Sequence, residues 1–432
     1  MNIACLGGGP AGLYFAISVK LRNPAHDITV FERNAPDNTF GWGVVLSDET
    51  LANLTANDRI SAAAIRDHFA YWDDICVSLR GQRMVSTGHG FCGIGRQRLL
   101  TLLQERATAL GVELRFEERI DDPTRYAEEY DLLVGADGLN SRTRDAYAKW
   151  FKPDVDVRKC KFVWLGTRQK FNDAFTFIFE QTEHGWVWAH AYQFDANTAT
   201  FIVECSEETW ERFGFGNMTQ AESARTCEQI FADHLGGHTL ESNARHMRGS
   251  AWISFPRVLC ERWSHENVVL LGDSAATAHF SIGSGTKLAL ESAAYLAQCL
   301  VETNDMASAF KRYEEARRVE VLRLQSAARN SLAWFEDVDR YVQLDPIQFN
   351  YSLLTRSQRI SHENLRLRDP NWLGQAEQWF QRRAGGASQP IRAPMFAPFM
   401  LREMRLDNRV VVSPMAQYKA EDGKPTDWHL VH

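Results

Sequence analysis

A glycine pattern near the start of the chain constrains the fold most strongly. Gly7-x-Gly9-x-x-Gly12 lies between a short apolar run, Ile3 to Leu6, and an apolar helical pattern, Ala11 to Leu21. In a strand–turn–helix unit the first glycine permits the tight turn and the second lets the backbone approach a pyrophosphate. The third lets the helix pack closely on the strand. The pattern therefore predicts one half of a dinucleotide-binding domain with a parallel sheet.

A second apolar stretch, "DITVFER", completes the unit and ends at Glu32, twenty residues beyond Gly12. An acid at this distance can accept hydrogen bonds from ribose hydroxyls. The preceding helix offers unpaired N–H groups and the positive end of its dipole to phosphates. Glu32 and its neighbour Arg33 are therefore candidate cofactor-binding residues. A glycine-rich turn without a ligand is the alternative.

Two later strands also end in carboxylates. "YDLLVGADG" places Asp137 after an apolar run, and "NVVLLGD" does the same with Asp273. In a parallel sheet, ligands bind at the carboxyl ends of the strands. Asp273 can meet a ribitol hydroxyl, and a helix beginning at Gly285 can point N–H groups at the pyrimidine edge of a flavin.

These three stretches, in this order over residues 1 to about 345, resemble the FAD-dependent single-component aromatic hydroxylases, the group that includes p-hydroxybenzoate hydroxylase. The resemblance implies FAD as cofactor and NADH or NADPH as co-substrate. It makes Arg96 in "GIGRQRLL" a contact of the FAD phosphates and ribose, and Arg144 the basic position after Asp137-Gly138. The cofactor-binding residues that it implies are Gly7, Gly9, Gly12, Glu32, Arg33, Val44, Arg96, Asp137, Asp273, Gly283, Gly285 and Thr286.

One stretch departs from the usual family pattern, which continues after Gly-Asp with Ala-Ala-His and then proline. Here His279 comes late, and Phe280-Ser281 stands where the proline is expected. Together with "GWGVVLS" at 41–47, this narrows the resemblance to a subgroup. That subgroup holds the monooxygenase part of the bifunctional salicylyl-CoA 5-hydroxylase and 2-aminobenzoyl-CoA monooxygenase-reductase enzymes. It also holds the tryptophan-derivative hydroxylase of violacein synthesis.

The middle of the chain changes to a period of two. "AFTFIFEQTEHGWVWAHAYQFDANTATFIVEC" predicts antiparallel strands joined at "EHG" and "DANT". Alternation places Trp188, His190 and Tyr192 on one side of the sheet. That side is either a pocket wall, with His190 or Tyr192 activating a phenol or aniline, or an ordinary core face. Likewise, the stretch 40–54, with Gly41, Trp42 and Gly43, either lies along the flavin or is a plain loop before a helix capped near Ser47.

The predicted fold class is α/β: a Rossmann-like FAD-binding domain with a parallel sheet, interleaved with an antiparallel substrate domain and followed by helices. Helices are expected over 306–342. The expected boundaries are 1–157 for the first part of the FAD-binding domain, 158–256 for the substrate domain, 257–380 for the last FAD-binding part and helices, 381–398 for a linker, and 399–432 for a separate tail.

The tail has its own resemblance. "LREMRLDNRVVVSPMAQYKAEDGKPTDWHLVH" is similar to the opening of an Old Yellow Enzyme flavin barrel, with Val410 to Val412 as a buried first strand. Ser413-Pro414-Met415 matches the turn under the FMN, and Asp427-Trp428-His429 the segment after it. A (β/α)₈ barrel needs about 250 residues. We therefore expect a truncated barrel that binds no FMN; an unrelated extension is the alternative.

Composition narrows the function classes. A net charge of −7 and a pI near 6.0 argue against nucleic-acid binding. No apolar run reaches the roughly 18 residues of a membrane span. The eight cysteines include no C-x-x-C pair, which predicts reduced, mostly buried thiols in a cytoplasmic protein and no metal site.

The resemblance implies an NAD(P)H-consuming monooxygenase that hydroxylates an activated aromatic ring with O₂ through a C4a-hydroperoxyflavin. The barrel-like tail favours an aryl-CoA thioester such as salicylyl-CoA or 2-aminobenzoyl-CoA as substrate. The alternatives are a hydroxylase of a free tryptophan-derived indole, a non-catalytic FAD-binding protein, and a flavin reductase of C=C bonds. Which ring position is hydroxylated, which nicotinamide cofactor is used and the oligomeric state stay open.

Overall fold

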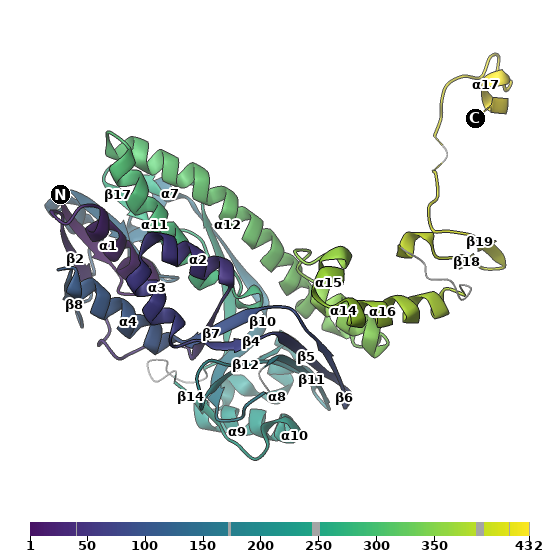
Figure 1. The fold of residues 1–432 in the computed structure, drawn as a ribbon, viewed down its shortest axis with the longest axis horizontal. Coiled ribbons are helices and arrows are strands. Elements are labelled where there is room, and N and C mark those ends of the chain that lie inside the picture. Colours follow the sequence, from purple (N-terminus) through teal and green to yellow (C-terminus); the bar gives the residue numbers. More distant parts are fainter. Residues whose placement is uncertain (40, 172–173, 244–250, 386–392, 414, 432) are drawn as a thin grey trace. The chain divides into compact units, whose positions relative to one another are not determined.

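The computed structural model describes residues 1–39, 41–171, 174–243, 251–385, 393–413 and 415–431 (Figure 1). They form two compact units, Met1–Asp369 and Pro370–His432. Three predicted features fall partly outside the described residues: Phe40 in the stretch 40–54, 386–392 in the linker, and Pro414 in the Ser-Pro-Met turn.

The predicted strand–helix–strand unit is confirmed. Strand β1 (Asn2–Leu6) leads into helix α1 (Pro10–Arg22), and β2 (Asp27–Phe31) pairs with β1 in parallel. They belong to a six-stranded sheet in the order β16-β17-β9-β1-β2-β8. Its other strands are β8 (Glu113–Arg115), β9 (Leu132–Gly135), β16 (Ser264–His265) and β17 (Val268–Leu270). All neighbours pair in parallel except β16 and β17, so the Rossmann-like fold class is correct.

Helices cover this sheet because their apolar positions are buried against it. Helix α1 is buried from Pro10 to Lys20 and packs against α11 (Gly285–Glu302) and α4 (Arg96–Ala109). The long helix α12 (Met306–Glu336) runs beside α11 (Figure 1). The predicted helices over 306–342 are therefore confirmed as α12 and α13 (Val338–Tyr341). The remaining helices of the first unit outside the antiparallel region are α2 (Asp48–Asn57), α3 (Arg59–Arg66), α5 (Pro123–Glu129), α6 (Arg142–Ala146), α7 (Ala148–Phe151), α14 (Pro346–Thr355) and α15 (His362–Arg368).

The antiparallel strands predicted from the period of two also form. They are β11 (Ala174–Thr182), β12 (Gly185–Gln193) and β13 (Ala199–Cys205). The sheet continues beyond them in the order β14-β10-β13-β12-β11-β5-β6, with β15 paired to β10. The added strands are β5 (Asp74–Leu79), β6 (Gln82–Ser86), β10 (Pro153–Thr167), β14 (Leu240–Ser242) and β15 (Ile253–Cys260). Three short strands, β3 (Gly43–Leu46), β4 (Ala70–Trp72) and β7 (Phe91–Gly95), form a separate sheet.

The two faces of this antiparallel sheet have different neighbours. One face builds an apolar core that includes Val187, Phe201 and Phe231, and α8 (Glu207–Phe213), α9 (Gln220–Ile230) and α10 (Ala232–Leu235) lie in this region of the chain. The opposite face carries Trp188, His190 and Tyr192 of β12, here called the aromatic stripe. The Tyr192 hydroxyl donates to the Gly43 carbonyl of β3 at 2.8 Å. The stripe therefore faces the glycine-rich segment predicted to lie along a flavin.

The second unit corrects one prediction. It contains α16 (Pro370–Arg383), a hairpin of β18 (Phe399–Leu401) and β19 (Met404–Leu406), and α17 (Asp427–Val431). The predicted buried strand over Val410–Val412 is wrong, because these residues belong to no strand and are 51%, 72% and 82% exposed. A strand needs hydrogen-bonding neighbours and a surface to cover its side chains, and the described residues supply neither to Val410–Val412.

Candidate active site

The turn after β1 leaves room for a phosphate. Gly7 has a φ of +114°, and a Cβ there would lie 2.2 Å from the Ala136 carbonyl oxygen. A Cβ on Gly12 would lie 2.0 Å from the Gly7 carbonyl oxygen, so helix and turn touch directly. A Cβ on Gly9, in contrast, would meet nothing within 4 Å. Helix α1 has no side-chain cap at its first turn, which leaves its N–H groups to a ligand.

Glu32 holds this turn together. One carboxylate oxygen accepts the Gly8 backbone N–H at 2.8 Å, and the other accepts the Asn34 backbone and side-chain N–H groups at 2.9 and 2.7 Å. Arg33 beside it is exposed. Glu32 thus lies where the motif predicts it, and its contact with a ribose stays a prediction.

Arg96 and Asp273 lie close enough to attract each other electrostatically. Arg96 begins α4, and its Nε is buried without a hydrogen-bond partner among the described residues. Asp273 follows β17, remains solvent-accessible, and lines a small recess with Gly272 and Gly285. Burial lowers the pKa of Arg96. Asp273 is open to solvent on one side, but the protein around it displaces enough water to raise its pKa, and the attraction between the two groups opposes both shifts. A polar cofactor could supply the hydrogen-bond acceptor that the buried Arg96 Nε lacks.

Asp137 and Arg144 stabilise a neighbouring loop. The Ser141 hydroxyl donates to Asp137 at 2.5 Å, and the Thr143 backbone N–H donates at 3.0 Å. Arg144 donates to the carbonyls of Leu139 and Ser274 at 2.7 and 3.3 Å. These contacts tie the loop after β9 to the turn that carries Asp273. A direct cofactor contact of Asp137 stays a prediction.

The beginning of α11 lies beside β3. Gly283 has a φ of +62°, and a Cβ there would lie 3.4 Å from the Val45 Cβ. Helix α11 starts at Gly285 without a side-chain cap, and Thr286 follows in its first turn. Val44 is 6% exposed in the adjacent strand. The structure therefore places Gly283, just before α11, against β3. Cofactor contacts of Val44, Gly283, Gly285 and Thr286 stay predictions.

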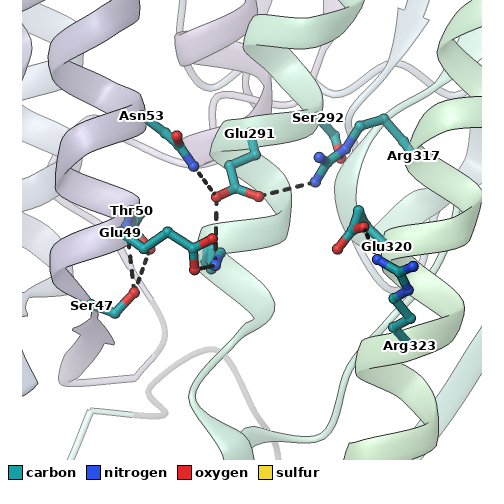
Figure 2. Close-up of polar contacts among 10 residues, drawn as sticks. Ser47, Glu49, Thr50, Asn53, Glu291, Ser292, Arg317, Glu320 and Arg323 are labelled. Carbon is teal, nitrogen blue, oxygen red and sulfur yellow. Dashed lines mark hydrogen bonds and ion pairs between the residues drawn. The ribbon is translucent and has the colours of Figure 1, made fainter.

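A polar network fixes α11 against its neighbours (Figure 2). Glu291 accepts hydrogen bonds from Asn53 of α2 at 2.8 Å and from Arg317 of α12 at 3.2 Å. Lys287, one turn before Glu291, pairs with Glu49 of α2. The Ser47 hydroxyl caps α2 by accepting the Thr50 backbone N–H at 3.4 Å, which confirms the predicted cap. Sequence reasoning missed the network because its partners are far apart in the chain.

The aromatic stripe on β12 is almost fully buried. His190 is 1% and Tyr192 5% exposed. The Trp188 Nε1–H donates to Glu204 of β13 at 2.8 Å, and the His190 Nε2 lies 3.1 Å from the same oxygen. Burial holds the pKa of His190 well below its usual value and raises the pKa of Tyr192. A catalytic role for His190 and Tyr192 stays a prediction. Sequence reasoning missed Glu204, although its place in an apolar strand was a signal.

These features fit a flavin dinucleotide. Open space over Gly9 lies next to an uncapped helix, and the buried Nε of Arg96 has no hydrogen-bond partner within the described residues. A protein-family model described as "FAD binding domain" matches residues 1–327. The chain is also 39% identical over 422 residues to a salicyloyl-CoA 5-hydroxylase from a Streptomyces species, covering 95% of this chain and 79% of that protein.

The chain belongs to the FAD-dependent aromatic hydroxylases. A protodeoxyviolaceinate monooxygenase from Chromobacterium violaceum is 33% identical over 368 residues, which cover 83% of this chain and 95% of that enzyme. The solved structure of 2-methyl-3-hydroxypyridine-5-carboxylic acid oxygenase superposes with a TM-score of 0.64 at 19% identity, covering 86% of this chain and 98% of that one. The protein is thus an FAD-dependent aromatic monooxygenase.

A short match points to another flavoprotein class. An NADPH dehydrogenase from Bacillus cytotoxicus is 48% identical over 44 residues, or 10% of this chain and 13% of that protein.

All eight cysteines are buried free thiols, as predicted. In the described ranges no helix is long and apolar enough to cross a bilayer, and no cluster of His, Cys, Asp or Glu there could hold a metal ion.

Proposed function

We propose that this monooxygenase hydroxylates an aryl-CoA thioester, with salicyloyl-CoA or 2-aminobenzoyl-CoA as the ring substrate. NADH or NADPH would serve as reductant and O₂ as the oxygen source. The observation that carries the proposal is the 39% identity over 422 residues to the Streptomyces salicyloyl-CoA 5-hydroxylase. A match over 95% of this chain includes the antiparallel sheet as well as the FAD-binding turn, so it includes the parts that would select a substrate.

Different residues of the site would bind FAD and shield the substrate ring. Bound FAD would accept hydride from the nicotinamide and supply the oxygen-transfer chemistry. The Gly7–Gly12 turn and Arg96 would hold its phosphates, and Asp273 its ribitol chain. The start of α11 would direct its N–H groups at the pyrimidine edge. The buried aromatic stripe on β12 would keep water away from the reacting ring.

Product analysis tests the proposal. The FAD-loaded protein is given salicyloyl-CoA, 2-aminobenzoyl-CoA and free indolic amino acids, each with NADH or NADPH, and products are identified by mass spectrometry. We expect one CoA thioester to gain a single oxygen atom that derives from labelled O₂. Products that have gained no oxygen atom, or no turnover of either thioester, would contradict the proposal.

A second candidate is hydroxylation of a free tryptophan-derived indole. The observation that favours it is the match to the Chromobacterium enzyme, which covers 95% of that protein. The same assay separates the two candidates, because an indole hydroxylase would convert the free indoles and leave both thioesters unchanged.

We infer that residues 399–432 correspond to the opening of an Old Yellow Enzyme-type barrel. Leu406-Asp407-Asn408-Arg409 and Asp427-Trp428-His429 supply the motif, and the 44-residue match to an NADPH dehydrogenase supports it. This assignment also favours a CoA-linked substrate, since the resemblance joins hydroxylase and barrel in enzymes that act on aryl-CoA thioesters.

A further inference from the structure

Glu204 lies where three parts of the first unit meet. Its strand, β13, pairs with β10 and β12, and its register partners there are Phe162 and Trp188. The loop that follows Asp273 approaches from the cofactor side, with the Phe280 ring centroid 4.6 Å from that of Phe162 and 5.6 Å from that of His190.

The third part is the end of α14. Arg356, which follows that helix, donates from one Nη to the Ser281 carbonyl at 2.8 Å and from Nε to the Ser331 hydroxyl of α12 at 3.0 Å. Ser281 and Ser331 are also hydrogen-bonded through their hydroxyls at 2.8 Å. The loop beside the predicted flavin edge is therefore held between the sheet and the C-terminal helices of this unit.

One oxygen of Glu204 has no hydrogen-bond partner among the residues that the structure describes. The side chain is 0% exposed, and its Oε2 is bonded to Trp188 and lies near His190. Its Oε1 is buried and accepts no hydrogen bond from any residue in the described ranges. A buried carboxylate oxygen without a donor is costly, and a hydroxyl group on a bound ligand would remove that cost.

The surroundings are otherwise aromatic. The His190 ring centroid lies 5.1 Å from that of Phe177 and 4.9 Å from that of Phe335. The Arg356 guanidinium lies 4.9 Å from the Phe177 ring centroid. Glu204 therefore lies within a closely packed cluster of aromatic rings and charged side chains.

The charged groups around Glu204 come from every element packed against it. Burial is the largest influence and raises its pKa to about 7; Glu336 of α12 acts in the same direction. His279 of the loop, the Trp188 hydrogen bond and Arg356 oppose the rise. Burial lowers the pKa of His279 to about 4 and that of His190 well below its usual value. Of these three groups, Glu204 is therefore the one whose pKa lies nearest to neutral pH.

We propose that Glu204 is the catalytic base that removes the proton of the ring hydroxyl of the substrate through its Oε1, an assignment that rests on the proposed function. The O–H bond of the ring breaks, its electron pair stays on the ring oxygen, and the proton binds Oε1 to give a neutral carboxylic acid. The resulting phenolate is richer in electrons at the ring carbon to be hydroxylated. Trp188 and His190 hold the carboxylate through Oε2.

The test compares Glu204→Gln and Glu204→Asp with wild type on salicyloyl-CoA. In wild type, kcat/KM should rise with pH through about 7, because ionised Glu204 is the active form. Glu204→Gln should lower kcat/KM by about 100-fold or more and lose this pH dependence, while Glu204→Asp should keep it with intermediate activity. Oxidised wild-type enzyme should bind salicyloyl-CoA as the phenolate at pH 8, seen in its absorbance, and Glu204→Gln should bind the neutral phenol.

Glu180→Gln is the matched control. Glu180 lies on β11 of the same sheet and contacts His234 at 2.7 Å, but its register partner Val187 belongs to the opposite core. This variant should keep the wild-type rate and pH profile.

The outcomes separate the two proposals. An active wild type whose Glu204→Gln variant retains its rate, pH profile and phenolate signal overturns the role of Glu204. A wild type that converts only free indoles overturns the proposed function and this inference together. If Glu204→Gln fails to fold or to hold FAD, Glu204→Asp and the wild-type pH profile decide, and a profile flat from pH 6 to 8 counts against the inference.

Discussion

Arg96 and Asp273 show how tertiary structure sets the properties of single residues. One begins a helix and the other follows a strand, yet each opposes the pKa shift that burial imposes on the other. Glu204 is a similar case, since its surroundings raise its pKa to about 7. The residue types are ordinary; the removal of water and of partners makes them candidates for binding and catalysis.

Asp273→Ala should weaken FAD binding. The change removes a carboxylate that would accept a hydrogen bond from the ribitol, at a cost of roughly 1.5–3 kcal/mol. Titration of the apoprotein with FAD, followed by flavin fluorescence, measures the dissociation constant. Asp154→Ala, at a carboxylate 67% exposed on β10, should bind FAD as wild type does. Equal affinity in the Asp273 variant would show that this position does not contact the cofactor.

His279 should make the protein less stable in acid. Its pKa falls from 6.5 to about 4 on folding, so between these values the unfolded chain binds a proton that the folded protein does not. The free energy of unfolding should therefore fall as pH drops from about 6.5 to about 4, by up to about 3 kcal/mol from this residue. Glu204 acts in the opposite sense, because its raised pKa favours the folded state at low pH.

Urea unfolding at pH 7 and pH 5 checks this prediction. His279→Asn should lose less stability than wild type between the two values, and His238→Asn, which changes an exposed histidine, should behave as wild type. An identical loss in wild type and His279→Asn would mean that other groups govern the acid response.

Among the elements, the position of α11 has to satisfy two requirements. Its first turn would face the flavin, and its later turns pack on α1 and α12. The polar network of Figure 2 contributes to that position. Glu291 and Arg317 have side chains only 13% and 11% exposed. Water therefore screens the attraction between them less than it screens pairs of surface charges. The network joins α2, α11 and α12, three helices that sequence analysis treats separately.

Glu291→Ala should lower the free energy of unfolding by about 1–3 kcal/mol, because Arg317 and Asn53 lose their acceptor in a largely buried place. Chemical denaturation measures the effect. Glu315→Ala is the control, since its pair with Lys311 has side chains 68% and 75% exposed, and it should change stability by less than about 0.5 kcal/mol. Equal effects from both substitutions would argue that the network does not hold α11.

At the scale of the whole molecule, the chain separates into one large unit, Met1–Asp369, and a small one, Pro370–His432. The residues assigned to FAD and to the aromatic ring all lie in the first. The second exposes apolar side chains, among them Val411, Val412 and Tyr418, and such exposed apolar surface favours association.

Deletion of residues 390–432 should therefore leave hydroxylation of the preferred substrate largely intact and should improve solubility. Steady-state kinetics and light scattering measure the two effects. A chain shortened to end at Leu344 should lose activity, because it lacks α14 and the Arg356 contact with Ser281. Loss of FAD, or a several-fold fall in turnover, in the shorter deletion would show that the tail supports the catalytic unit.

Cofactor content gives a further prediction for the full chain. Purified protein should release one FAD per chain and no FMN, because the dinucleotide-binding turn lies in the first unit and the described residues of 399–432 form a hairpin and a short helix rather than a barrel. Chromatography of the released flavin checks this, and stoichiometric FMN would contradict it.

Local patterns in the sequence predicted much of this protein. The glycines at 7, 9 and 12, the alternating strands near 174–205 and the cap at Ser47 depend on neighbours in the chain, so each appeared where expected. The β5–β6 hairpin, the network around Glu291 and the unpaired oxygen of Glu204 were not foreseen. The strand predicted at Val410–Val412 did not form, and the cause is the same for all four features. Strand pairing, long-range ion pairs and burial all require partners that only the folded chain brings together, because water satisfies every polar group until packing removes it.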